Sequence, residues 1–450
     1  MFGHLDDPLG ASPGARELAR VLRRAHVIRA RRRVAAVAAC VVVIVGFAGY
    51  LAGRPQTVHI SSTETGYQFN ELKGPLAVGT PVPTTALVNV VFDNAERGFA
   101  LAAHRDQAVL AETTDGGSSW QVQNGDLPSG YGQSTGYAGQ FEFVGSDGYL
   151  WGGAPESDGS VPLWVTSDGG ISWRSAAIGP VVYDVSAIGS NVWALAGACN
   201  VEPVGGAPAA PCPVVLEQSL DGGASWSAVD EAGFTEVVNA LPLAQRVELA
   251  RITLSRSYVL TTSAPDQSGT TELLFTGDSG ATWQTRPVPC GGAFDLGAEI
   301  AASGTDDLWL LCGSQASAGQ QSKQLYRSED GGTTWTLTAS ATGLGTPPPA
   351  ASQPNTLTLG GYIAPYSIGH KNLAVASPTT AWLYPFRSDL FKTVNGGLAW
   401  SAVPGLDTAG FGSGGPGNVT FISAQQGWIC EYGVGLWHTS DGVHWYPLGV

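Results

Sequence analysis

A motif of the form Thr-x-Asp-Gly-Gly-x-Ser-Trp recurs seven times along the chain. The copies occupy residues 113–120, 166–173, 219–226, 276–283, 328–335, 393–400 and a shortened 439–445. Their closing tryptophans lie 53, 53, 57, 52, 65 and 45 residues apart. Such a period is typical of chains in which each repeat is one small supersecondary unit of a propeller or a solenoid. The spacing therefore predicts a repeat protein.

Each repeat predicts four strands joined by tight turns. In the first repeat the strands are residues 88–93, 98–103, 108–114 and 119–123, and the motif forms the last turn. A content of 61 Gly, 28 Pro and only 13% charged residues suits many short strands. We expect an all-β fold at residues 88–450, a seven-bladed β-propeller of four-stranded blades, because a closed ring leaves only short strand edges exposed.

The chemistry of the motif predicts a structural role. Its Asp carboxylate can accept hydrogen bonds from the turn, its Thr or Ser hydroxyl can cap the same turn, and its glycines permit positive φ. The Trp supplies a large apolar surface at the start of the fourth strand. We expect these roles for Asp115, Trp120, Asp168, Trp173, Asp221, Trp226, Asp278, Trp283, Asp330, Trp335, Trp400, Asp441 and Trp445.

The copies TTDGGSSW, TSDGGISW, SLDGGASW, TGDSGATW and SEDGGTTW resemble the Asp-box, or BNR, repeats of sialidases and sortilin-type ectodomains. Together with a Trp on the second strand, they are most similar to the photosystem II stability/assembly factor family. That resemblance covers residues 88–450 and implies a seven-bladed propeller that helps to assemble membrane complexes. Three turns depart from the pattern, through Ser279, through Asn395 and through the missing residue between Asp441 and Trp445.

An uncharged run of 19 residues begins at Val34 and ends at Ala52. At about 1.5 Å per residue, a helix of this length spans the hydrocarbon core of a membrane. Six arginines stand shortly before the run, whereas Arg54 is the single nearby cation after it. By the positive-inside rule we expect a basic cytoplasmic tail (1–33), a single-pass transmembrane helix (34–52), a stem (53–87) and an extracytoplasmic propeller at the cell membrane. A cleaved signal peptide is the alternative.

Charge and cysteine use fit an exported domain. Residues 1–53 have a net charge of +5, while the remainder carries 14 basic and 34 acidic residues and should repel nucleic acid. Cys199 and Cys212 bracket one loop, and Cys290 and Cys312 flank neighbouring strands, so both pairs are candidate disulfides. Cys430 is left as a buried thiol. The chain has no CxxC pair or His cluster, so we expect no metal site and no cofactor.

Two classes of function remain open. An exo-sialidase-like glycoside hydrolase would need several arginines, a Tyr–Glu pair and an Asp at the ring centre. The arginines of the large part, including Arg97, Arg251, Arg256 and Arg387, are spread over different blades, and we expect them to be exposed and solvating. A shared fold is weak support for chemistry, so we expect no catalytic residues.

The other class is a binding or assembly scaffold for a protein or glycan partner. The loops after strands two and four of each blade open on one face, named here the insertion face, and the Asp boxes open on the other, the Asp-box face. Long insertions at 124–140, 199–212 and 340–368 fall on the insertion face. Aromatic loops on a rigid ring are common recognition sites, so we expect Tyr131, Tyr137, Tyr362 and Tyr366 to contact the partner.

Overall fold

The structure is a computed structural model. It describes residue 72 and residues 76–449, except 105–106, 129–138, 154, 198–213, 230–233, 235–243, 264–270, 292–296, 315–320, 342–371, 385–389, 404–417 and 432. These residues belong to one compact unit, Tyr67–Val450. The expected tail, the run from Val34 to Ala52 and most of the stem lie outside the described residues. Within the described ranges, no helix is both long and apolar enough to cross a membrane.

The described chain folds into seven four-stranded antiparallel sheets, each built from consecutive strands. The first three blades contain β1 (Leu87–Phe92), β2 (Gly98–His104), β3 (Gln107–Thr113) and β4 (Gln121–Asn124); β5 (Gln140–Val144), β6 (Asp147–Trp151), β7 (Trp164–Thr166) and β8 (Arg174–Ser175); and β9 (Val181–Ile188), β10 (Asn191–Gly197), β11 (Val214–Ser219) and β12 (Ser227–Ala228).

The remaining four blades follow the same order. They contain β13 (Ala244–Arg251), β14 (Ser257–Ser263), β15 (Thr271–Thr276) and β16 (Gln284–Arg286); β17 (Ala298–Ala302), β18 (Leu308–Gly313), β19 (Lys323–Ser328) and β20 (Thr336–Ala341); β21 (Leu373–Val375), β22 (Ala381–Leu383), β23 (Phe391–Thr393) and β24 (Ser401–Ala402); and β25 (Asn418–Phe421), β26 (Gly427–Glu431), β27 (Gly435–Thr439) and β28 (Tyr446–Leu448).

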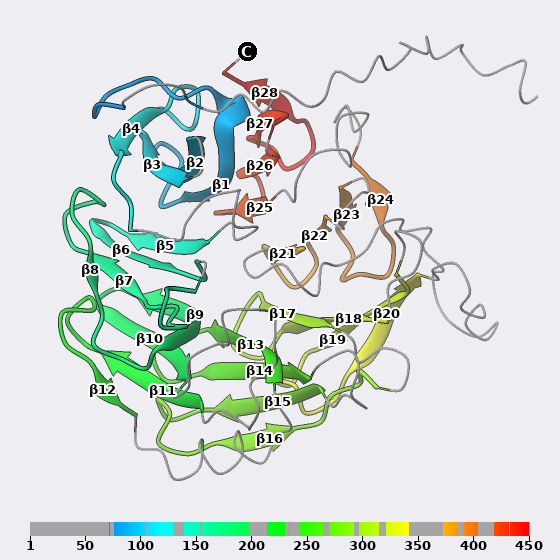
Figure 1. The fold of residues 1–450 in the computed structure, drawn as a ribbon. Coiled ribbons are helices and arrows are strands. Elements are labelled where there is room, and N and C mark those ends of the chain that lie inside the picture. Colours follow the sequence, from blue (N-terminus) through cyan, green and yellow to red (C-terminus); the bar gives the residue numbers. More distant parts are fainter. Residues whose placement is uncertain are drawn as a thin grey trace, which may run out of the picture. The chain divides into compact units, whose positions relative to one another are not determined.

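The seven sheets form a closed ring (Figure 1). The first strand of each blade contacts the first strand of the next, and β25 of blade 7 contacts β1 of blade 1. The inner edge of every sheet therefore faces the middle of the ring. The expected all-β, seven-bladed propeller with four-stranded blades is confirmed.

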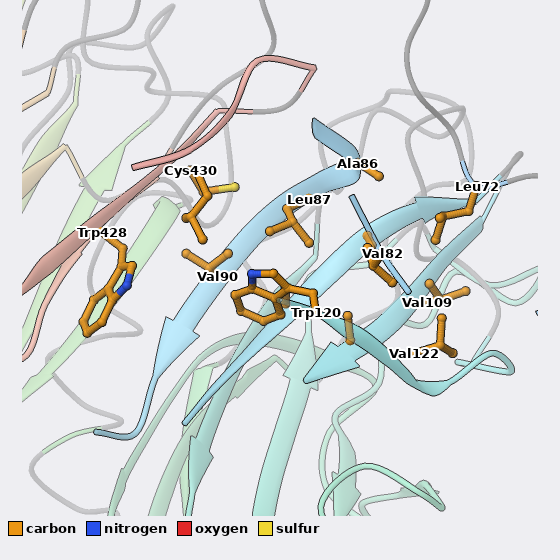
Figure 2. Packing of buried hydrophobic residues seen from close by; sticks show 14 of the residues in the cluster. Leu72, Val82, Ala86, Leu87, Val90, Val109, Trp120, Val122, Trp428 and Cys430 are labelled. Carbon is orange, nitrogen blue, oxygen red and sulfur yellow. The ribbon is translucent and has the colours of Figure 1, made fainter. Parts of the chain in front are cut away.

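Blades 1 and 7 meet without exchanging a strand, because each sheet is complete within its own repeat. Figure 2 shows the packing at this seam, where Val90 and Leu87 of β1 lie between Trp120 and the β26 residues Trp428 and Cys430. The rings of Phe92 and Trp428 stack at 3.6 Å between centroids. Apolar burial of this kind stabilises a contact by about 25 cal/mol per Å², so side-chain packing holds the seam.

The segment before β1 also joins these two blades. Val82 N donates to Trp120 O at 2.9 Å, and Thr80 O accepts from Val122 N at 2.8 Å, so an isolated antiparallel bridge between Pro81 and Gln121 lies along the outer edge of β4. A 3-10 turn, η1 (Thr84–Ala86), follows, and Thr84 Oγ1 donates to Leu448 O of blade 7 at 3.1 Å. Leu72, Val82 and Ala86 are buried in the same core cluster, so residues 76–86 clamp the seam.

Candidate functional site

The Asp box of blade 1 is a closed set of hydrogen bonds. Asp115 Oδ1 accepts from Thr113 Oγ1 at 2.8 Å and from Ser119 N at 2.9 Å, and Asp115 Oδ2 accepts from Ser119 Oγ at 2.6 Å. Thr113 Oγ1 in turn accepts from Gly117 N at 3.0 Å. Trp120 Nε1 donates to Gly117 O at 3.1 Å. One carboxylate therefore fixes both ends of the turn.

The carboxylate bonds recur in blades 2 to 5, around Asp168, Asp221, Asp278 and Asp330. The indole bond recurs in blades 2 to 4, whereas Trp335 Nε1 of blade 5 donates to Pro287 O at 2.8 Å. The hydroxyl and backbone N–H of the Ser or Thr four residues on bond the ionised carboxylate, and they lower the pKa of Asp168, Asp221 and Asp330 to about 2. These carboxylates are exposed yet occupied by the turn itself. They act as turn residues, and nothing in the geometry gives them a reacting group to act on.

The sixth and seventh turns keep the shape with different atoms. Asn395 Oδ1 accepts from Thr393 Oγ1 at 3.0 Å and from Ala399 N at 2.9 Å, so its amide oxygen replaces one carboxylate oxygen. In the last turn, Asp441 Oδ2 lies 2.7 Å from Nδ1 of His444, which takes the place of the Ser hydroxyl. The fourth turn also retains its geometry, because Ser279 adopts a φ of 64° where the other turns have Gly.

The Asp boxes also fasten neighbouring blades together. A Cβ built on Gly117, whose φ is +93°, would lie 2.9 Å from Leu436 Cδ2 of blade 7. Trp428 Nε1, also of blade 7, donates to Gly116 O at 2.9 Å. The second Gly of boxes 2 to 6 likewise packs against the blade before it. The turn therefore needs Gly for a close approach between blades as well as for positive φ.

The arginines serve the same purpose, which corrects the expectation that they are exposed and solvating. Arg97 bonds Glu112 at 2.8 Å and reaches Gly145 O of blade 2 at 3.0 Å. Arg251 of blade 4 donates to Ser186 O and Asn191 O of blade 3 at 3.1 and 2.9 Å. Both arginines are half-buried between two blades, and each bonds a backbone carbonyl group of the adjacent blade.

Two further arginines complete this account. Arg256 of blade 4 forms an ion pair of 2.9 Å with Asp306 of blade 5. Arg387 lies outside the described residues. Sequence reasoning missed these clamps because their partners are mostly backbone carbonyls, which no side-chain pattern reveals. Among the described arginines, the structure does not bring three to one point.

The inner strands carry a second set of clamps near the ring centre. Asp184 Oδ2 accepts from Leu249 N at 2.7 Å, and Glu248 Oε2 accepts from Ile300 N at 3.2 Å. Glu299 accepts from Leu373 N at 2.9 Å and from both nitrogens of Asn372 at 3.0 Å. Each carboxylate satisfies N–H groups on the inner strand of the next blade, whose edge has no strand partner.

The signal for these inner clamps was present in the sequence. Each first strand contains, or in β21 is directly preceded by, an acidic or amide residue followed by an apolar one: Asn89, Glu142, Asp184, Glu248, Glu299, Asn372 and Asn418. Asn418 closes the circle, because it accepts from Val90 N at 3.4 Å and donates to Val90 O at 2.8 Å across the seam. A polar residue in an otherwise apolar strand is a position that repeat alignment can find.

Buried polar groups gather at the insertion-face ends of blades 5 to 7. Lys323 Nζ donates to Gln321 O at 2.9 Å, and burial lowers the pKa of Lys323 to about 7. Tyr384, which follows β22, donates its hydroxyl to Glu431 Oε2 of blade 7 at 3.1 Å. These groups are at most 8% exposed. Within the described residues, no group of three or more His, Cys, Asp or Glu side chains could hold a metal ion.

The remaining candidate residues divide between the described and undescribed parts of the chain. Cys290 and Cys312 form a disulfide with a Cα–Cα distance of 5.5 Å, which ties the connection after β16 to β18 of the next blade. Cys430 is an unpaired, buried thiol whose pKa is raised by burial. Outside the described residues lie Tyr131, Tyr137, Tyr362, Tyr366, Cys199 and Cys212.

Exposed aliphatic side chains in the described ranges concentrate on the Asp-box face. Seven of the nine exposed large hydrophobic residues lie in Asp boxes or in the loops after the first strands: Ile171, Leu220, Leu254, Val394, Leu398, Ile422 and Val443. These two kinds of loop share a face, since Gly116 N of the first box donates to Glu96 O at 2.8 Å. Sequence reasoning placed recognition on the insertion face and did not single out these residues.

Comparison with known proteins gives the fold. No family model and no curated protein matches the sequence. Among solved structures, YCF48 from Cyanidioschyzon merolae matches with a TM-score of 0.50 and 13% identity, over 81% of this chain and 99% of that one. YCF48 bound to D1 peptide matches at 0.49 and 16%, over 82% and 98%. A PL25 ulvan lyase matches at 0.44 and 9%, over 83% and 94%. At these identities the likeness is one of propeller fold alone.

Proposed function

We propose that this protein is a membrane-tethered, extracytoplasmic propeller that acts as a binding or assembly scaffold for a protein or glycan partner. The main support for the proposal is that most of the described charged groups bond other parts of the propeller itself. Five described arginines (Arg97, Arg174, Arg251, Arg256 and Arg327), the Asp-box carboxylates and the inner-strand carboxylates bond the backbone or an ionised side chain of their own ring. A sixth, Arg286, lies over the ring of Phe275. A catalyst needs such groups aimed at a substrate, whereas a scaffold needs them to hold its shape.

The rigidity of the ring supports this role. Neighbouring blades are joined by up to three kinds of contact: an Asp-box turn, in five junctions an arginine or lysine bond on that face, and in most a polar clamp near the centre. Asn418 and Asp184 exemplify the central clamps, and Arg251 exemplifies those of the Asp-box face. Loops carried on such a frame lose little conformational entropy when they bind, provided that they are already ordered.

The insertion face is where we place recognition of this partner. The insertions at 124–140 and 340–368 carry Tyr131, Tyr137, Tyr362 and Tyr366, and Tyr side chains offer large contact area with one polar atom. The longer insertion connects β20 of blade 5 to β21 of blade 6, and the shorter one connects β4 of blade 1 to β5 of blade 2. The tether itself rests on the apolar run from Val34 to Ala52.

Replacement of residues 342–368 by a Gly-Ser linker, which leaves β20 intact, tests the proposal. The linker should leave the melting temperature close to that of the intact protein, since loop length has a slow entropic cost. Affinity capture from detergent-solubilised membranes should then recover less of the partner. A protein that melts normally and captures every partner of the intact chain would contradict the assignment. Hydrolysis of a fluorogenic sialoside by the intact chain would support the glycosidase alternative instead.

A further inference from the structure

The sixth Asp box differs from its neighbours in charge and polarity, although its turn has the same shape. Its sequence, TVNGGLAW, has lost the charge of the Asp and the hydroxyl four residues on, and it has gained Val394 and Leu398. These two side chains are 65% and 51% exposed. The equivalent positions in blade 1 are Thr114 and Ser118, which are polar. The sixth turn is therefore an uncharged, aliphatic tip on a face whose other turns carry an Asp.

This tip continues onto blade 7. Lys392 Nζ, two residues before Val394, donates to Gly442 O of the seventh turn at 2.7 Å, and Val443 beside it is 41% exposed. Ile422, in the loop after β25, is 39% exposed and precedes Ala424, whose carbonyl lies against Gly442. We name Val394, Leu398, Ile422 and Val443 the apolar patch. The bond from Lys392 to Gly442 joins the two turns that carry Val394, Leu398 and Val443, whereas single exposed side chains are ordinary on protein surfaces.

The opposite flank of the sixth turn is acidic. A Cβ on Gly396 would lie 2.9 Å from Arg327 Nη1, and Arg327 Nη1 in turn holds Glu329 Oε1 at 2.9 Å. Blade 5 and its border with blade 4 present four carboxylates against three arginines, a balance of −1: Asp306, Asp307, Glu329 and Asp330 with Arg256, Arg286 and Arg327. The Glu329 and Asp306 side chains are 74% and 53% exposed. On the blade 7 side, the positive charge of Lys392 balances the negative charge of Asp441. The excess negative charge therefore lies on the blade 5 side of the sixth turn.

We propose that the apolar patch and its acidic flank form a second docking surface, which binds a polypeptide segment carrying aliphatic anchors at one end and Lys or Arg at the other. The aliphatic anchors cover the tips of blades 6 and 7, and the cations lie over Glu329 and Asp306. Burial of the anchors supplies affinity, while the charges fix the direction of the segment. This surface lies on the Asp-box face, so it serves a different partner contact from the insertion face.

A labelled synthetic peptide with a leucine-rich half and a lysine-rich half tests the surface on the full-length protein. Fluorescence anisotropy should show saturable binding that weakens with added salt, because exposed charges are screened over about 10 Å at 0.1 M. The double substitution Val394→Ser with Leu398→Ser should weaken binding by about tenfold, equivalent to 1.4 kcal/mol. Its matched control is Ile171→Ser with Leu220→Ser, which changes the same kind of turn positions in blades 2 and 3 and should leave binding within about twofold.

The charge arm uses a second matched pair. Glu329→Gln should weaken binding and reduce its salt dependence, whereas Glu96→Gln, at an exposed loop position of blade 1, should change neither. Equal loss in the blade 6 variant and its blade 2 and 3 control would overturn the proposal. So would equal binding of a peptide whose lysines are replaced by glutamates. A change of oligomeric state in the blade 6 variant would assign the patch to a second copy of the chain and also overturn it. None of these outcomes depends on residues 342–368.

Discussion

At the scale of single residues, the sixth turn shows which atoms of the Asp box matter. Asn395 keeps the bond from Ala399 N because an amide oxygen accepts as a carboxylate oxygen does. Its second atom is a nitrogen, which cannot accept the hydrogen of a hydroxyl. The position that holds Ser119 in the first box is Ala399 here, so the two residues of the pair differ together. In boxes 1 to 5 the hydroxyl bonds the second carboxylate oxygen, and the sixth box lacks both groups.

Restoration of the pair gives a prediction at this scale. The double change Asn395→Asp with Ala399→Ser should raise the free energy of unfolding by about 0.5–1.5 kcal/mol, the net value of one hydrogen bond. The two single changes should contribute less than the double change when their effects are added. Chemical denaturation of the four proteins in a double-mutant cycle measures this coupling. Strictly additive effects would show that residue 399 does not bond the carboxylate.

At the scale of strands and turns, stability depends on how each turn meets the neighbouring blade. Gly117 and Gly79 both have strongly positive φ values, +93° and +83°. A Cβ on Gly117 would press against Leu436, whereas a Cβ on Gly79 would have no atom within 4 Å. An alanine would therefore strain the backbone at both positions, but only at Gly117 would its methyl group press against the neighbouring blade.

Alanine substitution at these two glycines separates the effects. Gly79→Ala should cost about 1–2 kcal/mol through the left-handed backbone. Gly117→Ala should cost that amount and a further 1–3 kcal/mol or so, because the methyl group overpacks the blade 1 and blade 7 seam. Thermal unfolding of the two variants beside the intact protein provides the comparison. Equal losses would mean that the seam yields freely and that the Asp box does not fasten the blades.

The sequence predicted the elements better than their contacts. Periodic motifs located every blade, since turn residues such as Asp168 and Gly170 are local signals. The partner of Gly117 is Leu436, more than three hundred positions away, and no local pattern joins them. The arginine clamps were also missed, because Arg251 binds carbonyl groups and every residue has one. The inner-strand clamps, Glu248 among them, were predictable from a repeated polar position that the search for apolar periodicity passed over.

At the scale of the whole molecule, the proposed membrane tether predicts where the ring works. Arginines cluster before Val34, and the large acidic part follows Ala52. We predict that a reporter fused after Val450 is active only outside the cytoplasm. Reversal of the charge bias, by changing Arg29, Arg31, Arg32 and Arg33 to Glu, should impair export and reduce that activity. Cytoplasmic activity of the unchanged fusion would remove both the tether and the extracytoplasmic placement.

The ring as a whole should lose stability in acid, because the Asp-box carboxylates of several turns become protonated over the same pH range. Bonds within the turns lower the folded pKa of Asp168, Asp221 and Asp330 to about 2, from an ordinary value of 3.8. A depressed carboxyl pKa contributes stability that is complete above the unfolded value and is lost as pH falls through the folded one. The melting temperature should therefore decline between about pH 4 and pH 2.

A variant can separate this decline from that of other carboxylates. Asp168→Asn with Ser172→Ala copies the natural pair Asn395 and Ala399, so the turn should survive without its titrating group. The variant should be less stable than the intact protein at neutral pH and should lose less on acidification. Its melting curve should then approach that of the intact protein near pH 2, because the intact turn has by then been protonated. Parallel curves for the two proteins from pH 5 to pH 2 would show that the Asp boxes do not govern acid stability.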